Sequence, residues 1–346
     1  MTGWADLQAG ISGVVKVRHA VLTVGGTWES APGTQYPSMV VAGLNTYVDD
    51  GLCYEVAVPY PASFGPVGGS ASSPSYQQSV ADGYNWIAEW LAANPLQTFV
   101  LGGYSQGAEV VSRVAIDIMD GPLAQYAPNF VGGYTFGNPC RGAGFYAPGI
   151  ADPGGHGISS LNMTELPMRD GQVVWADYVH SPANGDAGLD MYASVPNGQV
   201  GQDMTDVYTV ATGLQFNDLG ALTTDIVNAL VMAVKDLGLI PAFTGGIAGL
   251  AAAGLGALEG LLIGLISGPQ ANATGTQAAV EAALQGIDFL AAPGGPTAPH
   301  ISYVGEIGGY SNLVANAVGF LHNIATLTAR RPKPRKVIED EYQTPV

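Results

Sequence analysis

The feature that most constrains this sequence is the pentapeptide Gly103-Tyr104-Ser105-Gln106-Gly107 and the residues on either side of it. The short apolar run 98–102 leads into it, and 107–119 continues with the periodicity of a helix that has one apolar face. A strand that turns directly into a helix holds the central serine on a strained elbow, and the flanking glycines avoid clashes there. The pattern therefore predicts that the Ser105 hydroxyl is exposed as a nucleophile. Because the chain contains 49 glycines, the pentapeptide alone is weak evidence, and the strand–helix context carries the interpretation.

Further strands and helices alternate along the first 200 residues. Apolar and β-branched runs predict strands at 17–24, 53–60, 129–136 and 172–180, besides 98–102. Helical patterns cover 37–47, 76–93 and 107–119. Strands that alternate with helices predict an α/β protein with a doubly wound parallel sheet. Together with the serine elbow, this indicates the α/β-hydrolase fold.

The character of the chain changes after about residue 200. Residues 201–297 show no convincing strand and several helical runs, so we expect a helical insertion or linker subdomain between 1–200 and 298–330, the two parts of the core. Within it, 245–267 is long and apolar, but Glu259, the many glycines and the absence of flanking basic or aromatic anchors argue against a membrane span. Residues 311–329 predict a last helix. The basic-then-acidic segment 331–346 predicts a flexible tail.

Charge excludes some partners. The formal net charge is −17, with only 11 Lys and Arg, which argues against nucleic-acid binding and against electrostatic docking on anionic lipid.

The two cysteines, Cys53 and Cys140, are expected to be buried reduced thiols, and no Cys/His cluster indicates a metal. We expect no cofactor and no obligate protein partner. The first residues lack a basic region followed by an apolar run, so we expect no ordinary signal peptide.

A serine nucleophile needs a base, and in this fold the base follows the acid along the chain. The five histidines are His19, His156, His180, His300 and His322. Chain order excludes the first two, and His180 precedes any good acid candidate. His322 lies in a predicted helix, whereas His300 follows a loop rich in Pro and Gly. We therefore predict His300 as the base.

The acid is expected after the last predicted strand, where Asp177, Asp186 and Asp190 lie. Asp177 falls within the strand and is expected to be structural. Asp186 follows Asn-Gly and has the context of a turn residue, while Asp190 precedes a more ordered apolar stretch. Position alone leaves Asp186 and Asp190 as alternatives.

The oxyanion of the reaction needs two backbone N–H donors. One is the amide of Gln106, which follows the nucleophile. The other is expected in the loop after the first strand, Gly25-Gly26-Thr27-Trp28-Glu29, where Thr27 is the best candidate. An ordinary Gly-Gly turn is the alternative interpretation of this loop.

These residues resemble the cutinase-like serine esterases, and among them the lysin B enzymes of mycobacteriophages. The resemblance covers most of 15–215 and 298–325. It rests on the Gly-Thr after the first strand and on the segments GGYSQGAEVVSRV, TFGNPCR, LDMYASVP and PHISY. In the lysin B family the acid lies in a Gly-Asp-Met-Tyr-like context, which favours Asp190, although Leu189 replaces the glycine and keeps Asp186 as the alternative acid.

The resemblance implies a mycolylarabinogalactan esterase, which cleaves the ester between mycolic acids and arabinogalactan in the mycobacterial cell wall. It also implies synthesis in the host cytoplasm and release to the envelope at lysis. The family's helical insertion between acid and histidine matches 201–292 in position, and the apolar composition of this segment suits long acyl chains. Two other functions are considered: a cutinase-like lipase acting on other lipid esters, and a non-catalytic wall- or lipid-binding protein with the same fold.

Overall fold

A single parallel sheet forms the centre of the chain. The computed structural model describes residues 18–29, 35–47, 51–64, 73–213 and 298–328. Five strands pair side by side in the order β2-β1-β3-β4-β7, and every pairing is parallel. Their bounds are β1 His19–Val24, β2 Cys53–Ala57, β3 Phe99–Tyr104, β4 Phe130–Phe136 and β7 Trp175–Tyr178.

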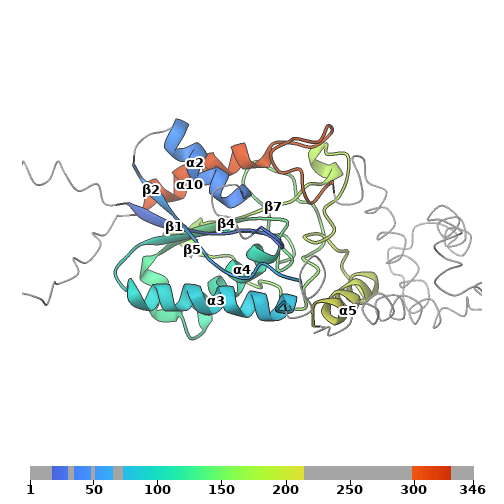
Figure 1. Ribbon diagram of the computed structural model, residues 1–346. Coiled ribbons are helices and arrows are strands. Elements are labelled where there is room, and N and C mark those ends of the chain that lie inside the picture. Colours follow the sequence, from blue (N-terminus) through green and yellow to red (C-terminus); the bar gives the residue numbers. More distant parts are fainter. Residues whose placement is uncertain (1–17, 30–34, 48–50, 65–72, 214–297, 329–346) are drawn as a thin grey trace, which may run out of the picture.

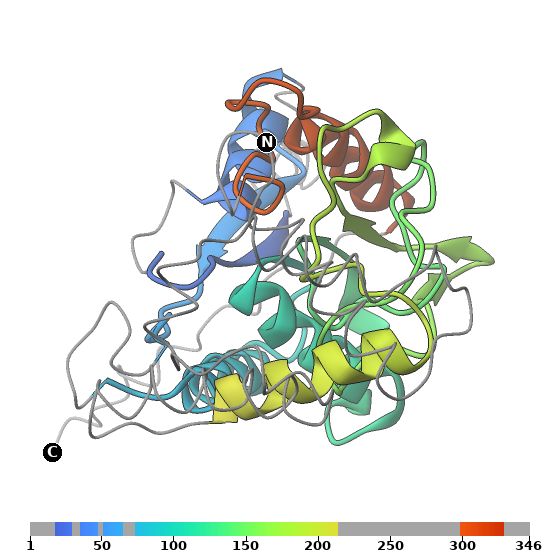
Figure 2. The same cartoon turned by 90° about the vertical axis from the view of Figure 1, so that its right-hand side faces the viewer.

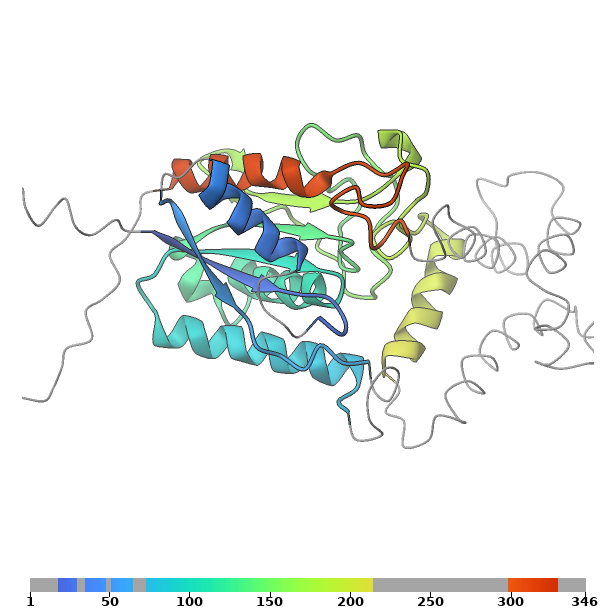
Figure 3. The same cartoon turned by 45° about the horizontal axis from the view of Figure 1, so that its top comes forward.

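Helices cover both faces of this sheet (Figure 1). On one face α2 (Tyr36–Tyr47) lies beside α10 (Leu313–Leu327), and on the other α3 (Tyr76–Ala93) packs against α4 (Gln106–Asp120). Figure 3 shows the same two layers from a second direction. The predicted α/β fold with a doubly wound parallel sheet is thus confirmed, and it is the arrangement that near-continuous apolar strands require when both faces are buried.

Alternate residues of the strands supply two separate cores. Leu22 and Leu101 pack in the core that includes residues of α3 and α4, while their neighbours Val21 and Val100 pack in the core that includes residues of α2 and α10. Successive side chains of a strand point to opposite faces, so adjacent apolar residues serve both layers. A rigid, fully covered sheet of this kind fixes the positions of the loops at its carboxyl edge.

The strand predicted at 172–180 is wrong as a single element. Residues Met168–Arg169 (β5) and Gln172–Val173 (β6) form a small antiparallel hairpin, and β7 begins only at Trp175. The hairpin turn is Asp170-Gly171, with φ of 49° and 78°. Positive φ at both central residues is the requirement of a type I′ turn, which Asp-Gly satisfies well. This turn diverts the chain before it joins the main sheet.

The other predicted elements agree with the structure within a few residues. The expected helix at 311–329 is α10, and turns at 298–303 lead to an isolated bridge between Val304 and Asn312 before it. Two short 3₁₀ helices, Ala124–Asn129 and Pro182–Asn184, complete the described elements. Cys53 and Cys140 are both buried, and neither is part of a disulfide.

The segment between the two parts of the core begins as a helix. Helix α5 (Gln199–Gly213), yellow in Figure 2, contacts α3. Residues 214–297, with the apolar run 245–267, and the predicted tail 331–346 lie outside the described residues. Among the helices that are described, none is both long and apolar enough to span a bilayer.

Candidate active site

Ser105 lies at the point where β3 turns into α4. Its backbone has φ 54° and ψ −120°, a left-handed conformation that costs a non-glycine residue about 1–3 kcal/mol. Its N–H donates to the carbonyl of Phe136 at 3.0 Å, which ties the elbow to the neighbouring strand. The strained serine predicted from the sequence is therefore present.

The two flanking glycines are required by close packing. A Cβ on Gly107 would lie 2.3 Å from the carbonyl oxygen of Val24, and one on Gly103 would lie 2.7 Å from the Cα of Ala108. Both distances are shorter than any real contact, and the neighbours are backbone atoms that cannot move aside. The elbow thus needs glycine at both positions, as the pentapeptide suggested.

His300 joins Ser105 to Asp190. Its Nε2 lies 2.8 Å from Ser105 Oγ, and its Nδ1 lies 2.8 Å from Asp190 Oδ2. The carboxylate can only accept, so Nδ1 carries the proton and Nε2 is free to accept the serine O–H. The Tyr104 hydroxyl donates to the His300 carbonyl at 2.9 Å and anchors the turn that carries the imidazole.

Asp190 is fully buried and held by several donors. Its Oδ1 accepts the backbone N–H of Tyr192 at 3.1 Å, and its Oδ2 accepts the Tyr303 hydroxyl at 2.6 Å in addition to His300. Gly137, with φ of 55°, lies against the pair, and a Cβ there would come within 2.6 Å of His300 Cε1 and 2.8 Å of Asp190 Oδ2. Sequence reasoning missed both Tyr303 and Gly137. The segments PHISY and TFGNPCR contain them, but nothing in their spacing indicates these contacts.

The alternative acid, Asp186, belongs to another pair. Its Oδ2 lies 3.1 Å from Nδ1 of His180, and it accepts the backbone N–H groups of Ser181 at 3.0 Å and Ser311 at 2.8 Å. Burial raises the pKa of Asp186, but the neighbouring His180 imidazole and the hydrogen bonds from these amides outweigh it and lower the pKa to about 2. Asp177 is structural as expected, with Thr135 and Asn138 donating to it at 2.5 and 2.7 Å. Of the three candidates, the structure brings only Asp190 to His300.

The predicted oxyanion loop adjoins the nucleophile. A Cβ on Gly26 would lie 3.3 Å from the Cβ of Ser105. The N–H of Gly26 donates to Glu29 Oε2 at 2.8 Å and that of Trp28 to the Ala62 carbonyl at 2.6 Å, so the amides on either side of Thr27 are engaged in holding the loop. Gln106 is the first residue of α4, where backbone N–H groups have no partner inside the helix. Thr27 and Gln106 thus stand on the two segments that flank Ser105.

Glu29 introduces a carboxyl group close to this site. Burial raises its pKa, while the Gly26 N–H and the charge of His300 act in the opposite direction. Beside it, Trp28 is 61% exposed, and Ile301, next to His300, is 42% exposed. Large apolar side chains in the predicted oxyanion loop and next to His300 are therefore exposed to solvent.

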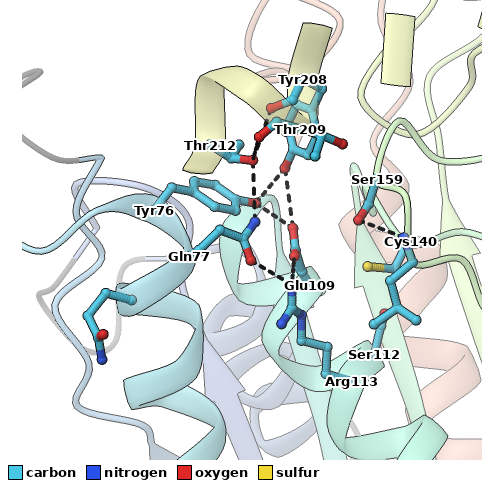
Figure 4. Close-up of polar contacts among 12 residues, drawn as sticks. Tyr76, Gln77, Glu109, Ser112, Arg113, Cys140, Ser159, Tyr208, Thr209 and Thr212 are labelled. Atoms are coloured by element: carbon cyan, nitrogen blue, oxygen red, sulfur yellow. Dashed lines mark hydrogen bonds and ion pairs between the residues drawn. The ribbon is translucent and has the colours of Figure 1, made fainter. Parts of the chain in front are cut away.

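Another buried carboxylate, that of Glu109, connects α4 to α5 (Figure 4). Glu109, whose N–H donates to the Ser105 carbonyl, accepts Arg113 at 2.6 Å and the hydroxyls of Tyr76 at 3.0 Å and Tyr208 at 3.3 Å. Tyr208 belongs to α5, so this cluster attaches the start of the inserted segment to α3 and α4. A cavity of about 270 Å³ adjoins it, lined by Gln77, Arg113, Ser159, Ser160, Tyr208, Thr209 and Thr212. Within the ranges that the structure describes, no group of His, Cys, Asp and Glu is arranged to hold a metal ion.

The chain is similar to known proteins over part or most of its length. A family model, the PE-PPE domain, matches residues 53–155, less than a third of the chain. No curated protein matches the chain. Lysin B from Mycobacteriophage D29 is similar in structure, with 24% identity and a TM-score of 0.44 over 88% of this chain and 99% of that one.

Two smaller proteins are similar over 57% of this chain. They are a cutinase-like protein from Cryptococcus sp. (24% identity, TM-score 0.36, 89% of that chain) and the catalytic core domain of acetyl xylan esterase from Trichoderma reesei (21% identity, TM-score 0.34, 95% of that chain). Each TM-score is below 0.5, so these likenesses do not assign a function to this chain.

Proposed function

We propose that the chain is a serine esterase that hydrolyses carboxylic esters. The observation that carries the proposal is the continuous hydrogen-bonded series Ser105–His300–Asp190, with 2.8 Å at each step, on a strained elbow at the end of a parallel strand. A hydroxyl, an imidazole and a buried carboxylate in this order are the groups that activate serine for acyl transfer. The proposal thus depends on the distances that join Ser105, His300 and Asp190.

The reaction follows from these positions. His300 Nε2 takes the proton of Ser105 as Oγ attacks the ester carbonyl, and Asp190 stabilises the imidazolium through Nδ1. The N–H groups of Thr27 and Gln106 are assigned to the oxyanion. His300 then protonates the departing alcohol, leaving an acyl-serine. Water, deprotonated by His300, releases the carboxylic acid and restores Ser105.

The finer proposal concerns the substrate: an ester of a long-chain acid with a sugar alcohol, specifically the mycolic acid ester of arabinogalactan. It is supported by the resemblance of the motifs around Ser105, Asp190 and His300 to the lysin B family. The exposed apolar side chains of Trp28 and Ile301 beside the site suit contact with an acyl chain.

The esterase activity is tested with Ser105→Ala. We expect hydrolysis of p-nitrophenyl butyrate to fall by about 10⁶-fold, because the nucleophile is lost. A fluorophosphonate probe should label the wild type and not the variant. Ser160→Ala, which removes an exposed serine away from the elbow, is the matched control and should keep both signals. Wild-type activity in Ser105→Ala, or an unlabelled wild type, would refute the esterase and leave a non-catalytic binding protein.

The substrate is tested separately. Purified mycolyl-arabinogalactan and a long-chain triglyceride are incubated with the wild type and with Ser105→Ala, and the released acids are measured. Release of mycolic acid by the wild type alone supports the finer proposal. Triglyceride cleavage without mycolate release would instead assign a lipase acting on other lipid esters.

A further inference from the structure

The aromatic side chain of Tyr303 lies between two Asp–His pairs at the carboxyl edge of the sheet. Tyr303 is fully buried, and its hydroxyl donates at 2.6 Å to Asp190 Oδ2, the same oxygen that accepts Nδ1–H of His300. The other side of its ring stacks on His180, with ring centroids 4.7 Å apart and an interplanar angle of 25°. His180 in turn contacts Asp186 at 3.1 Å. Tyr303 therefore contacts both the Asp190–His300 pair, which reaches Ser105, and the Asp186–His180 pair, which does not.

We infer that Tyr303 is a positioning residue for the esterase proposed above: its phenol fixes the Asp190 carboxylate, and the buried Asp186–His180 pair holds its ring in place. This inference rests on the proposed function. Asp186 then has a definite role although it is not the acid of the site.

The hydrogen bonds of Asp190 show why the phenol matters. A carboxylate can rotate about its Cβ–Cγ bond, and His300 alone would follow that rotation. Here Oδ1 is fixed by the Tyr192 N–H, and Oδ2 by the phenol, so the plane of the carboxylate is set before the imidazole binds to it. A contact of 2.6 Å to an ionised acceptor is in the range of charge-assisted hydrogen bonds, which are stronger than neutral ones.

Tyr303 is maintained as a donor by its surroundings. Burial and the negative charge of Asp190 raise the pKa of its phenol well above the ordinary value, so the O–H is retained at any pH at which a serine esterase works. Its backbone is fixed as well, because its carbonyl accepts the N–H groups of Leu313 and Val314 at the start of α10. The ring is enclosed by aromatic neighbours, with centroid distances of 5.6 Å to Tyr36 and 5.3 Å to Phe136.

Loss of the phenolic O–H has two expected effects. The carboxylate becomes free to turn, which misorients His300 and lowers kcat. Its negative charge is also less well compensated, so it holds the proton on His300 more strongly, and the acidic limb of the kcat/KM profile moves to higher pH. The other ionisable groups near Asp190 and His300 are unchanged by the substitution, and they are Glu29, Tyr104, Arg141 and Tyr192.

The test is Tyr303→Phe, assayed with p-nitrophenyl butyrate over a range of pH. Loss of one hydrogen bond to a charged group predicts a fall in kcat of about 10- to 100-fold. We expect KM to change by less than about twofold, because the ring that packs the site is retained. The acidic limb should move to higher pH. The matched control is Tyr178→Phe, which removes a phenol that donates to Asn316 at 2.9 Å on the same side of the sheet; its melting temperature should fall similarly with kcat unchanged.

The outcomes separate this inference from the proposed function. If fluorophosphonate labels wild-type Ser105 but Tyr303→Phe keeps wild-type kcat and pH profile, the positioning role is refuted while the esterase stands. An equal fall in kcat for Tyr303→Phe and Tyr178→Phe, without movement of the acidic limb, would also refute it, because that is the result of a packing role. Asp186→Asn serves as the second variant, should Tyr303→Phe not fold, and is expected to lower kcat by about 2- to 3-fold through a loosened His180.

Discussion

Two buried Asp–His pairs occupy the same edge of the sheet, and only one of them reaches a serine hydroxyl. Asp186 with His180 and Asp190 with His300 use the same atoms, a carboxylate Oδ2 and an imidazole Nδ1, at 3.1 and 2.8 Å. His300 Nε2 continues to Ser105 Oγ, whereas neither ring nitrogen of His180 makes a hydrogen bond among the described residues and its ring is stacked against Tyr303. The pairs therefore differ in what lies beyond the imidazole. Chemical identity of an Asp–His pair does not assign its role; the strand that brings a serine to it does.

The largest expected effect contrasts the two acids. Asp190→Asn should lower kcat by about 10⁴-fold, because an amide presents a donor to His300 and favours the wrong tautomer of the imidazole. Asp186→Asn should keep kcat within a few-fold of the wild type, because the hydrogen bond between His300 and Asp190 is unchanged. Both variants are measured by initial rates on p-nitrophenyl butyrate, with folding checked by circular dichroism. The reverse ranking would make Asp186 the acid and contradict the arrangement described here.

A second prediction concerns the glycine against which the Asp190–His300 pair packs. Gly137→Ala places a methyl group 2.6 Å from His300 Cε1 at a backbone φ of 55°, so the imidazole must move. We expect kcat to fall by about 100-fold, since a misplacement of 1 Å has costs of this order. The control is Gly144→Ala: this glycine also has positive φ, at 76°, but a Cβ there meets no atom within 4 Å. If both variants lost activity equally, backbone strain rather than the contact with His300 would be the cause.

The sequence was sufficient to predict the parts of the site that depend on residues close together along the chain. The elbow at Ser105 follows from a strand, two glycines and a helix within about twenty residues, and chain order selected His300 from five histidines. The alternation of strands and helices likewise predicted the parallel sheet, because each element shows its own apolar period. These inferences used neighbours along the chain, and the structure agrees with them.

The parts of the site that depend on contacts between distant segments could not be predicted from neighbours along the chain. Asp186 and Asp190 are four positions apart on one irregular loop, and each meets a histidine from a different segment. No periodicity distinguishes them, so the family resemblance favoured Asp190 where position alone left a choice. The separation of β6 from β7 within 172–180 was missed for a related reason: β6 pairs with β5, which lies before this run, while β7 pairs with β4 of the main sheet. Tyr303 is a distant contact of the same kind, since its phenol reaches an acid 113 positions earlier.

The smallest predicted effect is on stability at low pH and again separates the two acids. The folded pKa of Asp186 is lowered from 3.8 to about 2, so its ionised form favours folding by about 2 kcal/mol above pH 4, and this contribution is lost as the pH falls toward 2. Asp186→Asn lacks the titrating group. The difference in free energy of unfolding between wild type and variant should therefore shrink as the pH falls from about 4 toward 2. Urea unfolding at a series of pH values measures it. A difference that stayed constant down to pH 2 would mean that the charge of Asp186 contributes nothing, and that its hydrogen bonds to Ser181 and Ser311 are retained by the neutral side chain.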